Sequence, residues 1–109
     1  MTSILKEREI QRKAAREPAR LAARQRLRSA LRRHLPNRGV WLFGSIVHAE
    51  QFHKCSDVDI AVESLPEDMS IYTLTALLEE ELGRSVDVVY LSETRLRDKI
   101  LREGEAWTS

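Results

Sequence analysis

The stretch that decides the fold reads Val40-Trp-Leu-Phe-Gly-Ser-Ile-Val-His-Ala-Glu-Gln-Phe-His-Lys-Cys-Ser-Asp-Val-Asp-Ile-Ala-Val62. It opens with a continuous apolar run over residues 40–43, which is typical of a strand buried on both faces. The run stops at Gly44-Ser45, where we expect a short helical turn over residues 45–50. Eleven residues separate Ser45 from Asp57, at the start of a second apolar run. The pattern predicts two strands joined by a polar loop.

Two carboxylates, Asp57 and Asp59, stand at the entry to this second strand. Side chains two residues apart in a strand point to the same face, about 7 Å apart along the backbone. Like charges on one face repel each other unless a cation lies between them. Oxygen ligands favour Mg²⁺, with Mn²⁺ as an alternative. The pair therefore predicts the metal half of a phosphoryl- or nucleotidyl-transfer site.

Length and composition indicate one domain over residues 1–109, with a basic helical segment over 1–36 and a core over 39–104. The sequence is 42% hydrophobic and 32% charged, as expected for a soluble globular protein. Cys55 is the single cysteine, which excludes an internal disulfide. The sequence contains neither a membrane-length apolar run nor a signal-peptide core. These features predict a cytoplasmic protein with no membrane association.

The small net charge hides a strong asymmetry along the chain. Residues 1–38 contain 12 Lys or Arg and 3 acidic residues, a net charge of +9, whereas residues 39–109 contain 6 and 14, a net charge of −8. The basic segment could bind nucleic acid, an acidic partner or a nucleotide's phosphates. Alternatively, its arginines pair with the acidic residues of the same chain. Both interpretations stay open on composition alone.

The basic segment should be helical over residues 3–35, capped by Ser3 and divided in two at Pro18, which lacks a backbone donor. Its second half carries an apolar stripe at spacings of three and four, which should pack on the core: Ala23, Leu27, Ala30, Leu31 and Leu35. The first half could project outward. A turn over residues 36–39 should follow.

The remaining elements alternate between strands and helices. We expect strands over residues 58–63 and 85–91, and helices over 71–82 and 93–103. Ser70 and Gly83 should cap and end the first of these helices. Residues 105–109 read as a short tail on which Trp107 could contact a partner. The predicted class is α/β (α+β), with a small mixed β-sheet flanked by helices.

A third carboxylate, Asp87, lies within the apolar strand over residues 85–91. A carboxylate is costly in such a setting unless it is paired or bound to metal. If the two carboxylate-bearing strands are neighbours, three carboxylates converge and can hold two divalent ions for displacement at phosphorus. Gly44 would let the backbone approach a phosphate, and Ser45 and the following amides could bind its oxygens.

Three motifs carry a family resemblance: Leu42-Phe-Gly-Ser45, Ser56-Asp-Val-Asp-Ile-Ala-Val62 and Ser85-Val-Asp-Val-Val-Tyr90. In this order they resemble the nucleotidyltransferase superfamily that includes DNA polymerase beta. Within it the chain is similar to the minimal nucleotidyltransferases (MNT), the antitoxins of HEPN/MNT toxin–antitoxin pairs. The resemblance covers roughly residues 21–104. It implies the nucleotidyltransferase fold.

The resemblance also implies an activity and a set of roles. Such enzymes use ATP and Mg²⁺ to transfer AMP onto a tyrosine of a cognate HEPN ribonuclease toxin, which inactivates it. Here Gly44 and Ser45 would bind the nucleotide. Asp57 and Asp59 would bind both metals as catalytic residues. Asp87 would complete the metal site and could help deprotonate the attacking hydroxyl.

The sequence departs from the family pattern after Gly-Ser, where arginines are usual and Ile46-Val47-His48-Ala49 stands instead. Lys54 or the basic N-terminal helices could supply the missing charge, and His48 is interpreted as merely exposed. Two further hypotheses follow. The protein is a catalytically weak antitoxin that neutralises its partner by binding, through the basic helices and Trp107. Alternatively, it transfers a nucleotidyl group to RNA or to a small molecule.

Overall fold

A computed structural model describes the backbone of residues 4–53 and 55–109 and the side chains of residues 16–53 and 55–109. The expected cap Ser3 and the candidate Lys54 lie outside the described residues. In chain order the elements are α1 (Ile4–His34), β1 (Gly39–Phe43), the 3₁₀ turn η1 (Gly44–Val47), β2 (Val58–Val62), α2 (Ile71–Leu82), β3 (Val86–Tyr90), α3 (Arg97–Glu103) and β4 (Glu105–Thr108).

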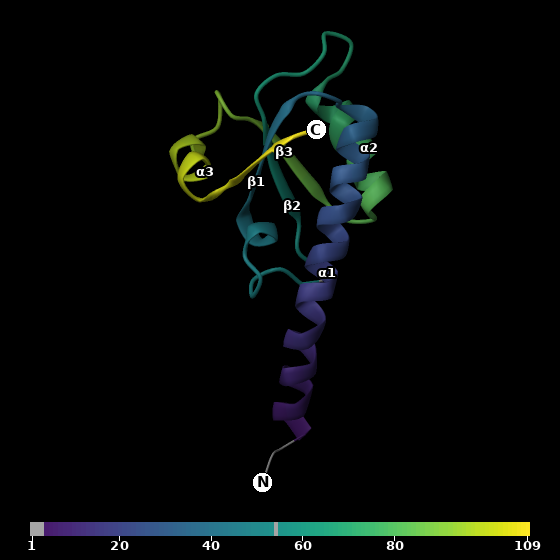
Figure 1. The fold of residues 1–109 in the computed structure, drawn as a ribbon, viewed down its shortest axis with the longest axis vertical. Helices are drawn as coiled ribbons and strands as arrows, with labels where there is room; N and C mark the ends of the chain where they lie inside the picture. Colours follow the sequence, from purple (N-terminus) through teal and green to yellow (C-terminus); the bar gives the residue numbers. More distant parts are fainter. Residues whose placement is uncertain (1–3, 54) are drawn as a thin grey trace.

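The four strands form one mixed sheet in the order β3-β2-β1-β4 (Figure 1). β1 runs antiparallel to both β2 and β4, whereas β2 runs parallel to β3. Parallel strands need a crossover connection, and α2 supplies it between β2 and β3. The predicted class, a small mixed sheet flanked by helices, is confirmed.

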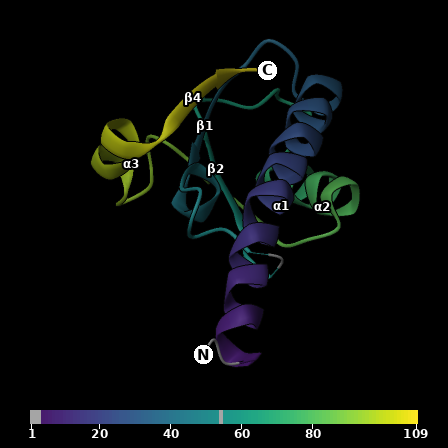
Figure 2. The same cartoon turned by 60° about the horizontal axis from the view of Figure 1, so that its bottom comes forward.

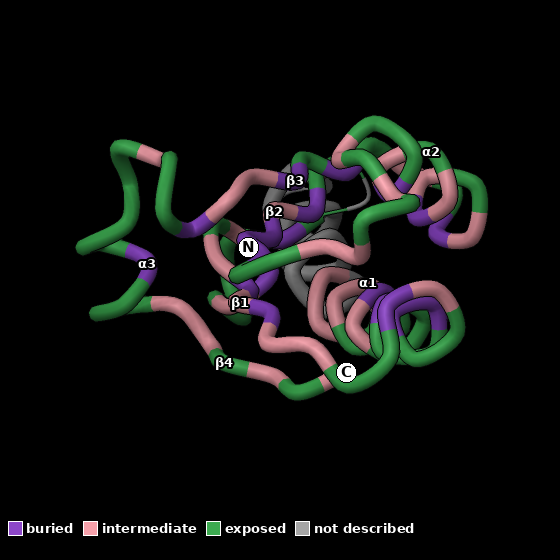
Figure 3. Tube along the Cα trace, turned by 90° about the horizontal axis from the view of Figure 1, so that it is seen from above, coloured by how far each residue is buried: buried purple, intermediate pink, exposed green. Residues whose placement is uncertain are grey.

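The helices cover the two faces of the sheet unequally. α1 and α2 lie on one face and α3 on the other (Figures 2 and 3). The main core lies between the sheet and the α1–α2 layer, and it includes the whole predicted stripe of α1. A smaller core gathers under α3 around Ile100, with Trp41 and Phe43 only half-buried beside it. The expectation that the first strand is buried on both faces is therefore wrong, because α3 is too short to cover the second face.

α1 is a single helix that continues through Pro18 for 31 residues. The predicted division at this proline is wrong. The side chains on either side of Pro18 hold the helix to the loop after β1: Arg16 donates to the carbonyl of Glu50 at 3.2 Å and Arg20 to that of Ile46 at 2.8 Å. These contacts offset the hydrogen bond that proline removes. The N-terminal turns of α1 extend beyond the rest of the molecule (Figure 1).

Several basic side chains of α1 pair with acidic residues of the core, as one of the two interpretations of the charge asymmetry expects. Glu81 contacts Arg33 at 2.7 Å and His34 at 2.8 Å, and Arg24 contacts Glu105 at 2.5 Å. The hydrogen bond with His34 is the main cause that lowers the pKa of Glu81 below its usual range. The hydrogen bond from Arg24 does the same for the pKa of Glu105. Part of the basic segment is thus used within the fold.

The chain's last residues form a strand, not a tail. β4 pairs with β1 so that Trp107 lies opposite Val40. The Trp107 ring is half-buried against the main core, and the guanidinium groups of Arg28 and Arg24 lie 4.3 and 5.3 Å from its centre. The expectation that Trp107 is exposed on a tail is therefore wrong, whereas its contact with a partner stays a prediction. The alternation of buried and exposed side chains over four residues is too short a signal to distinguish this strand from a tail.

The other boundaries follow the sequence closely. α2 has the predicted bounds: the Ser70 hydroxyl accepts a hydrogen bond from the Thr73 amide, and Gly83 ends the helix at a φ of 67°. α3 begins at Arg97 instead of residue 93, because a turn fills the intervening residues. Among the described residues, no helix combines the length and the apolar character that a membrane span requires.

Candidate active site

The parallel pairing of β2 and β3 sets Asp59 directly opposite Asp87. Asp59 is half-buried at the centre of the sheet, and Asp87 is exposed on the edge strand. Asp57 precedes β2 by one residue and is exposed. The neighbouring strands that the three-carboxylate prediction required are therefore present.

The Asp59 carboxyl is the electrostatic centre of this group. Burial, followed by the charges of Asp87 and Asp57, raises the pKa of Asp59 from 3.8 to about 6. Burial penalises the charged form, and neighbouring negative charges penalise it further. The two other carboxylates thus act on Asp59 from the positions that the sequence predicted. A cation among them would relieve this repulsion.

The donor chemistry of this group fits a divalent ion. All three side chains offer carboxylate oxygens, the ligands that Mg²⁺ and Mn²⁺ prefer. Within residues 16–53 and 55–109, however, no three acidic, histidine or cysteine side chains lie close enough together to form a complete metal site. Asp59 and Asp87 line the adjacent cavity, whereas Asp57 stands outside its lining.

Gly44 lies against the Asp59 carboxylate. Its φ is +74°, in the left-handed region that glycine adopts readily, and a Cβ at this position would lie 2.4 Å from Asp59 Oδ2. The backbone of the turn thus passes beside the carboxylate, and the role of Gly44 in binding a phosphate stays a prediction. Ser45 is half-buried and does not line the cavity. Its backbone carbonyl accepts a hydrogen bond from the His48 amide.

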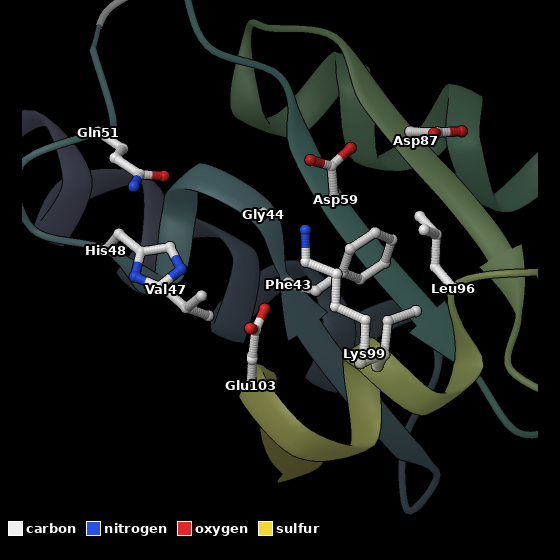
Figure 4. Close-up of a pocket in the computed structure, with 11 residues that line it drawn as sticks. Phe43, Gly44, Val47, His48, Gln51, Asp59, Asp87, Leu96, Lys99 and Glu103 are labelled. Atoms are coloured by element: carbon white, nitrogen blue, oxygen red, sulfur yellow. The ribbon is translucent and has the colours of Figure 1, made fainter.

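A cavity of about 550 Å³ opens between the end of β1, η1 and α3 (Figure 4). This volume lies in the range of small-molecule sites. The cavity is lined by Phe43, Gly44, Val47, His48, Gln51, Asp59, Asp87, Leu96, Lys99, Ile100 and Glu103. Sequence-predicted residues thus contribute one wall, formed by the strand ends and the Gly-Ser turn.

The opposite wall comes from α3 and the residue before it, and the sequence did not predict it. Leu96, Lys99, Ile100 and Glu103 recur at spacings typical of one helix face. That spacing is visible in the sequence, but only the packing of α3 on the sheet shows that the face lines a cavity. His48, expected to be merely exposed, is exposed and also lines the cavity. Gln51 was not singled out.

Packing accounts for the first of the positions that lack arginine. Ile46 is fully buried in the main core, so a side chain at this position does not face the cavity. Arg16 and Arg20 approach the same loop from α1, but they donate to backbone carbonyls and do not line the cavity. The proposal that the basic N-terminal helices replace the missing charge thus gains no support from the lining.

Arg84 fixes the loop that leads to Asp57. Its Nη1 donates to the carbonyls of His53 at 3.2 Å and Ser56 at 3.1 Å. Its guanidinium also lies 4.6 Å from the centre of the buried Phe52 ring. Burial lowers the pKa of Arg84 from its ordinary value. This residue therefore positions the approach to the carboxylates from the far end of α2.

Residues 25–108 match the family model described as polymerase beta, nucleotidyltransferase. The chain belongs to this nucleotidyltransferase family. The matched range contains all four strands and every candidate site residue, and it leaves out the first turns of α1. The resemblance that the three motifs indicated is confirmed.

Several solved structures share the fold. A chain from a toxin–antitoxin complex crystallised with AMP-PNP is 27% identical with a TM-score of 0.61, over 78% of this chain and 73% of that chain. A chain from the MntA–HpeT toxin–antitoxin with a tyrosine-to-alanine substitution is 26% identical with a TM-score of 0.59, over 79% and 72%. A structure assigned to a minimal nucleotidyltransferase is 31% identical with a TM-score of 0.53, over 77% and 88%. None of the curated proteins matches this nucleotidyltransferase significantly.

Proposed function

We propose that this protein is an antitoxin with protein adenylyltransferase activity, which transfers AMP from ATP to a tyrosine of a cognate HEPN toxin. The observation that carries the proposal is the pairing of Asp59 with Asp87 across β2 and β3, beside the left-handed turn at Gly44. Carboxylates beside a backbone that admits a phosphate are what a nucleotidyl transfer requires.

In this proposal Asp57, Asp59 and Asp87 hold Mg²⁺ or Mn²⁺, which when bound neutralises charge on the triphosphate and lowers the pKa of the attacking hydroxyl. Gly44 lets the triphosphate approach the turn, with Ser45 beside it. Asp87 is exposed on the edge strand, where an acceptor hydroxyl can reach it and give up its proton. The tyrosine oxygen then bonds to the α-phosphorus, the bond to the β-phosphate breaks, and pyrophosphate leaves with the electron pair.

The solved structures support the partner and the nucleotide. Two of the similar chains come from toxin–antitoxin crystals, one of them with an ATP analogue and the other with a substituted tyrosine. The chain covers more than two thirds of each of these proteins, so the likeness extends over most of their length. By analogy, we propose that this chain binds a toxin partner, uses ATP and modifies a tyrosine.

The test is transfer of label from α-labelled ATP and Mg²⁺ to the product of the neighbouring gene. We expect label on one tyrosine of that protein and loss of its toxicity. The double variant Asp57→Ala plus Asp59→Ala should abolish both, and Asp68→Ala, an exposed loop carboxylate, should leave both unchanged. An unlabelled partner, together with unchanged neutralisation by the double variant, refutes the enzymatic function.

Neutralisation by binding alone is the second candidate, favoured by the cavity's lining of three carboxylates, Asp59, Asp87 and Glu103, against one lysine. It predicts that the double variant still protects cells, and that removal of residues 1–20 abolishes the complex. Transfer to RNA is less favoured, because several arginines of α1 already make contacts within the fold and so contribute less to binding RNA phosphates.

A further inference from the structure

The candidate active-site cavity carries an unbalanced charge. Its lining contains the carboxylates of Asp59, Asp87 and Glu103, and one permanent cation, Lys99. η1 contributes no basic residue in its last turn. ATP bound to one Mg²⁺ still carries negative charge on its outer phosphates, and those oxygens need donors. The cavity offers them one ammonium group.

Lys99 is aimed at the cavity from α3. Its ammonium group points to the middle of the space, toward Gly44 and Asp59 on the opposite wall (Figure 4). The four-carbon stem of lysine spans such a gap while its backbone stays on the helix. The charge therefore lies where the turn and the central carboxylate meet.

The helix that carries Lys99 is firmly placed. Ile100, the next residue of α3, is 1% exposed and packs on Ala61 and Leu91 in the smaller core. Gly104 ends the helix so close to β1 that a Cβ would lie 2.8 Å from the carbonyl oxygen of Leu42. These contacts fix the side of α3 that faces the cavity.

The ammonium group of Lys99 is not used within the fold. Among the described side chains, no carboxylate lies within ion-pair distance of it and no hydrogen bond engages it. Arg16 and Arg20 of α1, by contrast, donate to the backbone carbonyls of Glu50 and Ile46. A solvent-facing lysine on a helix is ordinary, but one that projects into a cavity opposite two carboxylates has a ligand-binding geometry.

We propose that Lys99 binds the outer phosphates of the nucleoside triphosphate. This inference rests on the proposed function and assigns the polyphosphate recognition to α3. Lysine binds phosphate as a point charge, so it does not require a preformed fork geometry. Lys99 is a substrate-binding residue in this scheme and takes no part in proton transfer.

The test measures binding of three probes by calorimetry: Mg²⁺–ATP, Mg²⁺–tripolyphosphate and AMP. We expect Lys99→Ala to weaken the first two by about tenfold or more, since a hydrogen bond to a charged group contributes on this order. AMP, which lacks the outer phosphates, should bind within about twofold of wild type. Lys99→Arg should restore most of the loss, and Arg102→Ala, an exposed cation of the same helix that does not line the cavity, should change nothing.

Binding of Mg²⁺ alone provides a second measurement, in which Lys99→Ala should not weaken the affinity. Removing the positive charge across the cavity from Asp59 should leave Mg²⁺ affinity unchanged or raise it. A general collapse of the cavity would instead weaken every probe, and that result overturns the proposal. So does equal affinity of wild type and Lys99→Ala for tripolyphosphate. If wild type binds neither Mg²⁺–ATP nor tripolyphosphate, the proposed function fails together with the role of Lys99. If wild type binds both and Lys99→Ala binds them equally well, only the role of Lys99 fails.

Discussion

Gly44 and Asp59 are in direct apposition: a Cβ on Gly44 would lie 2.4 Å from Asp59 Oδ2. The register of β1 and β2 creates this contact, because Phe43 pairs with Asp59 and Gly44 is the next residue. The φ of +74° then turns the chain away from the strand. Glycine is therefore required here for two reasons: the positive φ of the turn and the lack of room for a Cβ beside the Asp59 carboxylate.

Gly44→Ala should lower the proposed adenylyl transfer by roughly 100-fold, because the new methyl displaces the Asp59 carboxylate and misplacement of about 1 Å has this effect. The left-handed conformation should also cost about 1–2 kcal/mol of unfolding free energy. Gly83→Ala is the matched control: its φ is +67°, and nothing lies within 4 Å of its Cβ position. We expect the same loss of stability in urea with full activity. Equal activity of the two variants contradicts the steric argument.

Asp59→Asn should stabilise the metal-free protein at neutral pH. The pKa of Asp59 is raised to about 6 in the folded state, above the ordinary 3.8, so the folded protein holds this proton more tightly than the unfolded chain. That contribution is complete below about pH 4 and is lost as the pH rises through about 6. Since the carboxyl is half-exposed, screening reduces the effect to about 1 kcal/mol.

Urea unfolding with a chelator, from pH 4 to pH 8, measures this difference between the two proteins. The wild type should fall below Asp59→Asn as the pH rises, and Mg²⁺ at pH 7.5 should restore the wild type alone. Asp68→Asn, in an exposed loop, is the control. A constant difference at all pH values would show that Asp59 does not titrate in this range.

Arg20→Ala should loosen the turn that carries Gly44. Arg20 Nε donates to the carbonyl of Ile46 at 2.8 Å, and its side chain is only 14% exposed. Loss of a hydrogen bond from a charged group costs about 2 kcal/mol. Hydrogen exchange should show faster exchange of the His48 amide, which bonds within η1. Arg32→Ala, exposed on the same helix, should stay within about 0.5 kcal/mol of wild type.

Trp107→Ala should destabilise the fold by about 2 kcal/mol or more, because the ring packs on the main core beneath Arg24 and Arg28. Tyr72→Ala is the aromatic control, since this side chain is 85% exposed. Denaturation midpoints of the two variants provide the measurement. Should Trp107→Ala weaken only the complex with the partner and leave the midpoint unchanged, the ring would be an interface residue after all.

Short-range sequence pattern was sufficient to predict the elements whose ends are set by residues close in the chain. α2 begins at Ser70 and ends at Gly83 as predicted, because a cap and a stop act on neighbouring residues. The strands that carry Asp59 and Asp87 were found from their apolar runs. Their convergence required one further condition, that the two strands be neighbours. The sequence left this condition open, and the parallel pairing of β2 and β3 meets it.

The predictions that were wrong concern segments whose structure depends on contacts between residues distant in the chain. Pro18 predicts a break, but Arg16 and Arg20 tie the helix to a loop about thirty residues away in the chain. Residues 105–108 carry almost no periodic signal, and β1 turns them into a strand by pairing with them. The same pairing converts Trp107 from an apparently exposed side chain into part of the core.

The sequence by itself determined the carboxylates, the glycine turn and the family, because these depend on residue type and short spacing along two strands. Only the tertiary structure decided what faces them. α3 brings Lys99 and Glu103 to the cavity through the packing of Ile100 on the sheet, while Ile46 turns into the core where a cation was expected. Spacing fixes which side chains share a face, but the direction of that face is set by the burial of its neighbours.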